Sequence, residues 1–242
     1  MADEITSIWV YLATSPLLWL TMTLAAFALG SWLNHLLGGS PALHPVLLSM
    51  GLLIAVLLLT GTDYDTYFEG AQFVHFMLGP ATVALAIPLY DHREQILAWL
   101  GPLLVAGLAG TAVAALSAVV VGALLGAGPA TLLSMAPKSV TSPIAMGVAE
   151  KLGGLPSLTA ALVLMTGSLG CVMAPPLIRL LRIRDDAVKG FAMGLTAHGL
   201  GTAQAFSISA TAGAFAGLGL SLAGLLTAFL LPLLVGFLPI QP

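Results

Sequence analysis

Residues 160–181 read AALVLMTGSLGCVMAPPLIRLL and contain no charged residue before Arg179. A helix needs about 20 predominantly apolar residues to cross the roughly 30 Å hydrocarbon core of a bilayer, and this run supplies them. A strand of a membrane barrel would alternate apolar and polar residues over about ten positions, which this run does not do. The stretch therefore predicts a membrane-spanning α-helix.

The whole chain has the composition of a protein that lies within a membrane. Its 242 residues are 59% hydrophobic and 7% charged, with a mean hydropathy of +1.05, whereas an average soluble domain is about 25% charged. Backbone polar groups inside a bilayer must be satisfied internally, so helices or a closed barrel are the only spanning structures. We predict an all-α integral membrane protein, a polytopic helical bundle of roughly seven to nine membrane segments that forms one domain over residues 1–242.

The sequence argues against several classes of function. The net charge is −3 and no basic stripe is present, so we expect no nucleic-acid partner. The single cysteine, Cys171, can form no internal disulfide and is expected to be a packing residue. Asp3 and Glu4 stand where a cleavable signal peptide would be basic, so the first helix is expected to be its own insertion signal. Without Ser-His-Asp order, a phosphate loop, paired carboxylates or metal-ligand spacing, we expect no enzyme, no metal and no cofactor.

Turn residues and charges divide the chain into segments. We expect spans over 16–37, 45–60, 96–125, 156–181 and 213–238, an acidic loop over 63–69, and broken segments over 68–90, 126–151 and 187–209. The basic cluster at 179–189 predicts a cytoplasmic loop. Arg93 is then expected on the cytoplasmic side and residues 63–69 on the outer side. These sides conflict with the number of membrane crossings if every broken segment crosses fully. They agree if one broken segment is a re-entrant hairpin, and the sequence leaves open which one.

The stretch from Pro137 to Pro143 places Lys138, Ser139, Thr141 and Ser142 in the middle of an apolar segment. A lysine costs about 3 kcal/mol at the centre of a membrane helix, so it normally faces a partner or a water-filled cavity. The two prolines remove helix hydrogen bonds, and amides at the start of a half-helix form an anion site. We favour a carboxylate site here. In the alternative, Lys138 snorkels to an interface and the hydroxyls bond back to helix carbonyls.

Residues 78–87 read as an apolar counterpart of this stretch. At a spacing of 57 residues, Pro80 matches Pro137, Thr82 matches Ser139, Val83 matches Val140 and Ile87 matches Ile144. Repeats with paired helix breaks are the best sequence indication of a transporter site. We therefore predict an internal, inverted repeat of units 16–125 and 129–238, although chance matches in an Ala- and Pro-rich chain remain the alternative.

A third polar group, His198, Gly201, Thr202 and Gln204, interrupts the segment 187–209. Glycines permit departure from the helix, and a histidine at membrane depth is a candidate proton carrier. A histidine bonded across helices for packing is the equal alternative. The remaining histidines are expected at solvated helix ends or loops, except His75, which is a candidate to face the broken segment 68–90.

Three separated motifs resemble the LrgB/CidB family of antiholin-like membrane proteins. They are the stretch from Pro137 to Met146, the stretch from Leu78 to Ala86, and His198 to Ala203, and Arg182 to Asp185 with Lys189 and Gly190 fits the same pattern. The similarity covers nearly the whole chain.

This resemblance implies a multi-pass protein of the bacterial inner membrane. It implies a partner, a small LrgA/CidA-type membrane protein, and a carrier-like fold with crossed, broken helices that works as a homodimer. The family is related to a plastid glycolate and glycerate translocator and is linked to pyruvate transport, and it is also described as holin-like or antiholin-like, modulating murein hydrolase activity and lysis. Two charged positions of the family pattern are replaced here, an acidic one by Gly147 and a basic one by Gln204.

Two hypotheses follow for the function. In the first, the chain is a transporter of small monocarboxylates: Lys138, Ser139, Thr141 and Ser142 bind the carboxylate, Pro80 and Thr82 lie opposite, and His198, Gly201, Thr202 and Gln204 line the same cavity. In the second, it is a holin-like or antiholin-like module whose Gly and Ala faces drive association. The sequence leaves open the specific carboxylate, the coupling ion and whether the small partner is obligatory.

Overall fold

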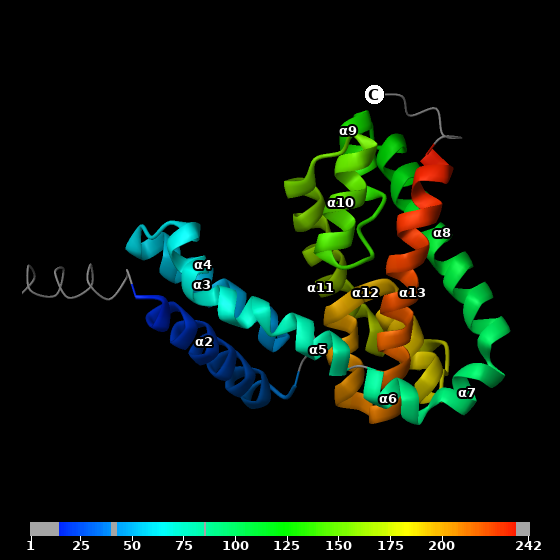
Figure 1. Cartoon of the computed structure of the whole chain (residues 1–242), viewed down its shortest axis with the longest axis horizontal. Coiled ribbons are helices and arrows are strands. Elements are labelled where there is room, and N and C mark those ends of the chain that lie inside the picture. Colours follow the sequence, from blue (N-terminus) through cyan, green and yellow to red (C-terminus); the bar gives the residue numbers. More distant parts are fainter. Residues whose placement is uncertain (1–14, 40–42, 85, 236–242) are drawn as a thin grey trace, which may run out of the picture. The chain divides into compact units, whose positions relative to one another are not determined.

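The computed structural model describes residues 15–39, 43–84 and 86–235, and in these ranges the regular elements are helices (Figure 1). The chain forms two compact units, Met1–Ala84 and Leu85–Pro242. Five described helical stretches are long and apolar enough to cross a membrane: Pro16–Leu36, Tyr64–Asp91, Leu100–Leu124, Pro156–Leu180 and Ala210–Val235. The predicted all-α polytopic membrane protein is confirmed.

The first unit contains α2 (Pro16–Leu36), α3 (Pro45–Thr60), α4 (Tyr64–Phe76) and α5 (Leu78–Ala84). The first two match the predicted spans, because a proline sets the start of each helix and its apolar run sets the length. Trp19 of α2 is fully buried, and its ring lies edge-on to Tyr67 of α4 at 5.9 Å between centroids. The Thr23 hydroxyl donates to the Tyr67 hydroxyl at 3.2 Å, so these contacts join α2 to α4.

The predicted acidic loop over 63–69 is wrong, because these residues form the start of α4. Asp63 occupies the N-cap position with an extended backbone, where an acidic residue favours the helix dipole. Aromatic rings then recur at helical spacing: Tyr64 stacks on Phe68 at 5.6 Å, one helical turn along. The acidic residues are therefore the first turn of a helix.

The second unit contains eight helices that carry the candidate site. They are α6 (Ala86–Asp91), α7 (Arg93–Ala98), α8 (Leu100–Leu124), α9 (Pro129–Met135), α10 (Ser142–Leu152), α11 (Pro156–Leu180), α12 (Asp186–Ile208) and α13 (Ala210–Val235). Helix α11 confirms the span expected over 156–181, since it begins at the same residue and ends one residue earlier. Helix α13 begins three residues before the span expected over 213–238, and residues 236–238 lie outside the described residues. The span expected from residue 96 begins at Leu100, because the chain leaves helical geometry at Trp99.

Helix α12 is a hairpin and does not cross the unit. Its backbone breaks at Ala197 (φ −119°, ψ 16°) and His198 (φ 43°, ψ −131°). A straight helix of 23 residues would separate its ends by about 33 Å, yet the carboxylate of Asp186 at its start accepts a hydrogen bond from Ser209 just past its end. We call residues 186–196 the first arm and residues 199–208 the second arm. The two arms run in opposite directions and meet at His198.

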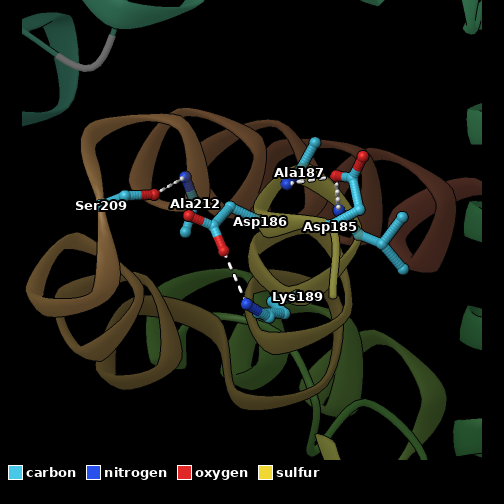
Figure 2. A network of polar contacts seen from close by, with 7 residues as sticks. Asp185, Asp186, Ala187, Lys189, Ser209 and Ala212 are labelled. Atoms are coloured by element: carbon cyan, nitrogen blue, oxygen red, sulfur yellow. Dashed lines mark hydrogen bonds and ion pairs between the residues drawn. The ribbon is translucent and has the colours of Figure 1, made fainter. Parts of the chain in front are cut away.

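Close contacts between glycines and backbone fix the direction of the first arm. An added Cβ on Gly190 would collide with the carbonyl of Ala212, and one on Gly194 with the carbonyl of Ala216. Because both residue numbers rise together, the first arm runs parallel to α13. Both helices therefore begin at the same end of the bundle, next to the polar cluster of Asp186, Lys189 and Ser209 (Figure 2).

The segment 129–152 also forms a hairpin, and it enters from the opposite end of the bundle (Figure 1). In chain order, we call this segment the first hairpin and α12 the second hairpin. Leu132 of α9 packs at Gly122, near the end of α8. In α10, Ile144 lies at Gly224 in the middle of α13, whereas Val148 shares a cluster with Leu231 near the end of α13. Helix α10 thus runs from the middle of the bundle to the end at which α9 began.

These directions resolve the conflict between the predicted sides. Helix α8 runs parallel to α13, because Gly107 packs on Leu222 and Ala115 shares a cluster with Leu231. With the arginines that follow α11 on the cytoplasmic side, Arg93 also lies on that side and α11 begins on the other, as the sequence indicates. The broken segments 126–151 and 187–209 both form hairpins, which enter the second unit from opposite ends.

Candidate functional site

The tip of the first hairpin is an irregular turn between α9 and α10. Helix α9 ends at Met135, and the amide of Val140 bonds to the carbonyl of Pro137 at 3.3 Å. Thr141 is the N-cap residue of α10 (φ −60°, ψ 144°), and Pro143 lies in the first helical turn, where a missing N–H costs nothing. The first-turn amides of α10 therefore point into the tip without a side-chain cap, since the Thr141 hydroxyl accepts no cap hydrogen bond.

Lys138 lies half-buried in this tip with a single polar side-chain contact. Its Nζ donates to Ser139 Oγ at 3.4 Å, and within the described part of the chain no carboxylate pairs with it. Val140, two residues on, is 1% exposed and belongs to the main core cluster with Phe215 of α13. The tip is thus deep in the unit, away from the ends of the helices.

The hydroxyls of the tip do not bond back to the helix backbone. Among the described residues, Ser139, Thr141 and Ser142 form no bond from the hydroxyl back to a helix carbonyl, whereas Ser134 in α9 does so at 2.7 Å to Ala130. The back-bonding alternative therefore does not describe these three side chains. All three are partly exposed.

The tip of the second hairpin is held by His198. Its ring is 5% exposed, and Nε2 lies 3.0 Å from the carbonyl of Val163 in α11. Gly167, one turn further along α11, leaves room for the ring, because a Cβ there would lie 2.6 Å from Nε2. The positive φ of His198 is a conformation that only glycine adopts without strain. Contacts with α11 hold the residue in it.

Two of the other predicted residues in this segment support the hairpin itself. The Thr202 hydroxyl donates to the carbonyl of His198, one helical turn earlier, at 2.9 Å, and so bonds back to the backbone at the start of the second arm. Gly201 lies against the carbonyl of Met193 in the first arm, where any Cβ would collide. Both residues therefore have structural roles beside the tip.

Val163 joins the second tip to the main core cluster. This cluster contains Val140 of the first tip and Leu195 near the end of the first arm of α12, and the Val163 carbonyl binds His198. Helix α10 and the second arm both begin at their tips, so the positive ends of two helix dipoles lie at the middle of the unit. Together with the Lys138 ammonium, these ends form an environment that favours an anion.

Gln204 and Gly147 stand where the resemblance led us to expect a basic and an acidic residue. Gln204 Nε2 donates to the carbonyl of Cys171 at 3.2 Å, but its Oε1 is buried without a partner in the described residues. Gly147 on α10 has open space beside it, since an added Cβ would meet no atom within 4 Å. Cys171 itself is 1% exposed, as expected for a packing residue.

Pro80 and Thr82 lie in α5 of the first unit, so their predicted place opposite Lys138 stays a prediction. Pro80 is exposed. The stretch from Leu78 to Ala84 is helical, unlike the turn that its counterpart forms at Pro137. The predicted repeat of units 16–125 and 129–238 likewise stays a prediction, although a hairpin followed by a long helix occurs twice, in opposite directions, within residues 129–235.

His92 has a role that the sequence did not predict. It was expected to be solvated, but its Nε2 lies 3.0 Å from Thr211 Oγ1 and its ring packs edge-on to Phe215 of α13. It thereby joins the α6–α7 corner to the start of α13, next to the base of the second hairpin. No local signal indicates a contact between residues 119 positions apart.

The base of the second hairpin is closed by charges. Asp185 Oδ1 accepts hydrogen bonds from the amides of Ala187 and Val188 at 2.8 and 3.2 Å, and Lys189 Nζ lies 2.7 Å from Asp186 Oδ1 (Figure 2). Hydrogen bonds from Lys189 and from Ser209 hold the pKa of Asp186 below its usual value. This exposed cluster fixes the two ends of α12 to each other.

We expect Asp186→Asn to reduce the pH dependence of stability in acid. Because the carboxylate has a lowered pKa in the folded chain, it contributes stability above about pH 4 that is lost as the pH falls through the folded pKa. Melting temperatures in detergent from pH 6 to pH 3 measure this contribution. The wild type should lose more stability than Asp186→Asn, and Asp91→Asn, an exposed carboxylate outside the cluster, should behave as the wild type. Equal losses in all three would show that the cluster does not form.

Comparisons with known proteins agree with this architecture. Residues 23–237 match the LrgB-like family. The chain is 36% identical over 194 residues to the uncharacterized protein YwbG of Bacillus subtilis (strain 168), which covers 80% of this chain and 86% of that protein. It is 27% identical over 196 residues to the holin-like protein CidB of Staphylococcus epidermidis (strain ATCC 12228 / FDA PCI 1200), covering 81% and 86%. No solved structure matches the chain.

Proposed function

Because this chain belongs to the LrgB-like family, a family of multi-pass membrane proteins, we propose that it is a carrier of small monocarboxylates such as glycolate, glycerate or pyruvate. We place it in the cytoplasmic membrane of a bacterium, as a homodimer that works beside a small LrgA/CidA-type membrane protein. The ligand of the proposed carrier is a small anionic solute.

The observation that carries this proposal is the pair of hairpins of the second unit, which are joined through one core cluster: Val140 at the first tip and Val163 belong to it, and the Val163 carbonyl binds His198 at the second tip. Non-helical backbone at membrane depth is tolerated where it is buried in protein or lines a water-filled cavity. Carriers bind their solutes at such places, with the positive ends of half-helices directed at anionic groups. A packing module has no need of a lysine and three hydroxyls at that depth.

In the proposed site, Lys138 pairs with the carboxylate of the solute, and the first-turn amides of α10 bind its second oxygen. The hydroxyls of Ser139, Thr141 and Ser142 then bind the hydroxyl or keto oxygen that distinguishes one small acid from another. His198 bounds the site from the second hairpin. Because the hairpins enter from opposite sides, movement of either tip away from Val163 opens the site to one side at a time.

A holin-like module is the second candidate, and the names of the staphylococcal relatives favour it. Helices α12 and α13 approach each other through glycines at alanine backbone, a packing that also drives association of membrane helices. In this candidate the chain forms or restrains a non-selective pore. Such a pore leaves Lys138 without a specific task.

Proteoliposomes holding the purified chain distinguish the two candidates. We expect saturable uptake of radiolabelled pyruvate or glycolate, competed by the unlabelled acid, with no release of an entrapped dye. The assay is run with and without the small partner protein, because a requirement for the partner would otherwise look like inactivity. Dye release together with non-saturable entry of the acids would sink the carrier and support the pore.

A further inference from the structure

An apolar groove lies between α11 and the first arm of α12, away from the hairpin tips. It encloses a volume of about 300 Å³. Its walls are aliphatic and thioether side chains, among them Met173, Leu177, Ile178, Leu181, Ile183 and Met193. Met173, Leu177 and Leu181 are more than a third exposed, so the groove is open along its length at the surface of the second unit.

One end of this groove carries a concentration of positive charge. Leu181 and Ile183, which line that end, are the immediate neighbours of Arg182. Arg179, Arg182 and Arg184 are three of the seven Lys and Arg residues of the whole chain, and all three are exposed.

These arginines have no acidic partner in the described residues. The two nearest carboxylates along the chain are engaged elsewhere, since Asp185 caps α12 through Oδ1 and Asp186 pairs with Lys189 (Figure 2). The end of the groove therefore keeps its positive charge, on the side where the loop meets the cytoplasmic leaflet.

Arg182 stands at a backbone position that favours glycine. Helix α11 ends in a Schellman motif, in which the amide of Ile183 bonds to the carbonyl of Ile178 and that of Arg182 to Arg179. The residue at the left-handed position of this motif is usually glycine, but here it is Arg182 with φ +55°. The motif fixes the arginine beside Ile178 and Ile183, both of which line the groove.

We propose that this groove binds one anionic phospholipid of the cytoplasmic leaflet. An acyl chain lies along the groove between α11 and the first arm, and the lipid phosphate is bound by Arg182 and Arg184. Arginine suits this task, because its planar guanidinium binds phosphate oxygens in a bidentate manner, and basic pockets between helices on the cytoplasmic side recognise lipid headgroups.

Topology alone does not account for these features. The preference for positive charge in cytoplasmic loops explains basic residues between α11 and α12, but it is indifferent to whether an arginine occupies a left-handed position next to an open apolar groove. A second copy of the chain fits less well, because it would have to bring carboxylates to three arginines, and the exposed Glu94 of the described second unit already lies 3.7 Å from its own Arg93. A lipid combines an apolar chain and an anionic head in the order in which the groove presents them.

The test measures lipid-dependent melting of the purified full chain in an uncharged detergent. Phosphatidylglycerol should raise the melting temperature of the wild type by about 5–10 °C at saturation, and native mass spectrometry should retain one lipid per chain. Phosphatidylcholine should give less than half of that rise. Glycerol phosphate, which is the headgroup alone, should give none.

Arg182→Gly separates binding from folding. Glycine is unstrained at this position, so the variant should melt at or above the wild-type temperature without lipid, yet lose most of the rise with phosphatidylglycerol. Ala192→Phe, which fills the groove from an exposed position on α12, should also reduce the rise. Arg93→Gln is the matched control, because Arg93 lies over the Tyr90 ring outside the groove, and it should keep the full rise.

Four results would overturn the proposal. They are an equal rise with phosphatidylcholine, an undiminished rise in Arg182→Gly, a full rise with glycerol phosphate alone, and a dimer that forms through Ala192 while no lipid is retained. The last would assign the groove to a second copy. None of these results depends on transport, so the proposal stands or falls apart from the proposed carrier function.

Discussion

Lys138→Met should abolish saturable uptake of small monocarboxylates and leave the fold intact. Removing one partner of a desolvated charge pair costs about 2–5 kcal/mol of binding, which corresponds to a loss of affinity of at least about 30-fold. Methionine keeps an unbranched apolar side chain up to Cε and removes the ammonium group with its charge and its hydrogen-bond donors. Uptake of radiolabelled pyruvate over a range of concentrations into proteoliposomes, normalised to the amount of inserted protein, measures the loss.

The thermal stability of Lys138→Met should not fall with its uptake. Lys138 is half-buried with one long hydrogen bond, to Ser139, so its charge is poorly solvated in the absence of a solute. We expect the melting temperature of Lys138→Met to equal or exceed that of the wild type. Lys151→Met is the matched control, because Lys151 is exposed at the other end of α10 and its loss should change neither property. Saturable uptake by Lys138→Met within threefold of the wild type would remove Lys138 from the site.

The long helices could be predicted closely because their signals are local. Prolines start α2, α3 and α11, and the apolar run that follows each proline sets its length. The failure at 63–69 has a local cause too. Acidic residues in the first turn of a helix and acidic residues in a loop have the same composition, and only the aromatic spacing from Tyr64 to Phe68 distinguishes them.

Re-entry could be suspected from the sequence but not assigned. Helix α12 has 23 residues, enough to cross a bilayer, and the break at His198 is compatible with a kinked span. What makes it a hairpin is a set of distant contacts, such as Asp186 with Ser209 and Gly190 with Ala212. Contacts of this kind depend on which backbones can approach, and a single sequence does not display them.

The candidate site divides in the same way. Lys138 and the neighbouring hydroxyl residues could be selected from the sequence, because polar groups are costly, and therefore rare, in an apolar run. The hydrogen bond between His198 and the Val163 carbonyl could not be predicted, since a backbone acceptor in an apolar helix has no signature in the sequence. Thr202 was predicted to line the cavity, and in the structure its hydroxyl bonds to the backbone of His198.

This arrangement joins structure to the proposed mechanism through one residue. His198 sits in a strained conformation at the tip of the second hairpin, and the bond to Val163 is the only described hydrogen bond of its ring. Strain held by a single contact is a means of keeping two states close in free energy. In the proposed carrier, a bound solute would replace that contact and release the tip from α11.

His198→Gly and His198→Ala should differ in stability and agree in function. Both lose the bond to Val163, but glycine adopts the φ of +43° without strain, whereas alanine does not. We expect His198→Ala to be less stable than His198→Gly by about 1–3 kcal/mol, seen as a melting temperature lower by about 2–12 °C. Uptake should fall at least tenfold in both variants, because neither restores contact between the second tip and α11.

The comparison within this pair keeps folding and function apart. If His198→Ala and His198→Gly have the same melting temperature, the left-handed conformation at the tip is absent in solution. Wild-type uptake by the well-folded His198→Gly would instead show that the ring only packs, which is the alternative the sequence left open. Gly167→Ala provides an independent approach to the same contact, because its methyl group would occupy the space of the imidazole. Gly167→Ala should lower uptake although the chain still contains the imidazole of His198. This outcome would assign the effect to the position of the tip rather than to proton transfer by the ring.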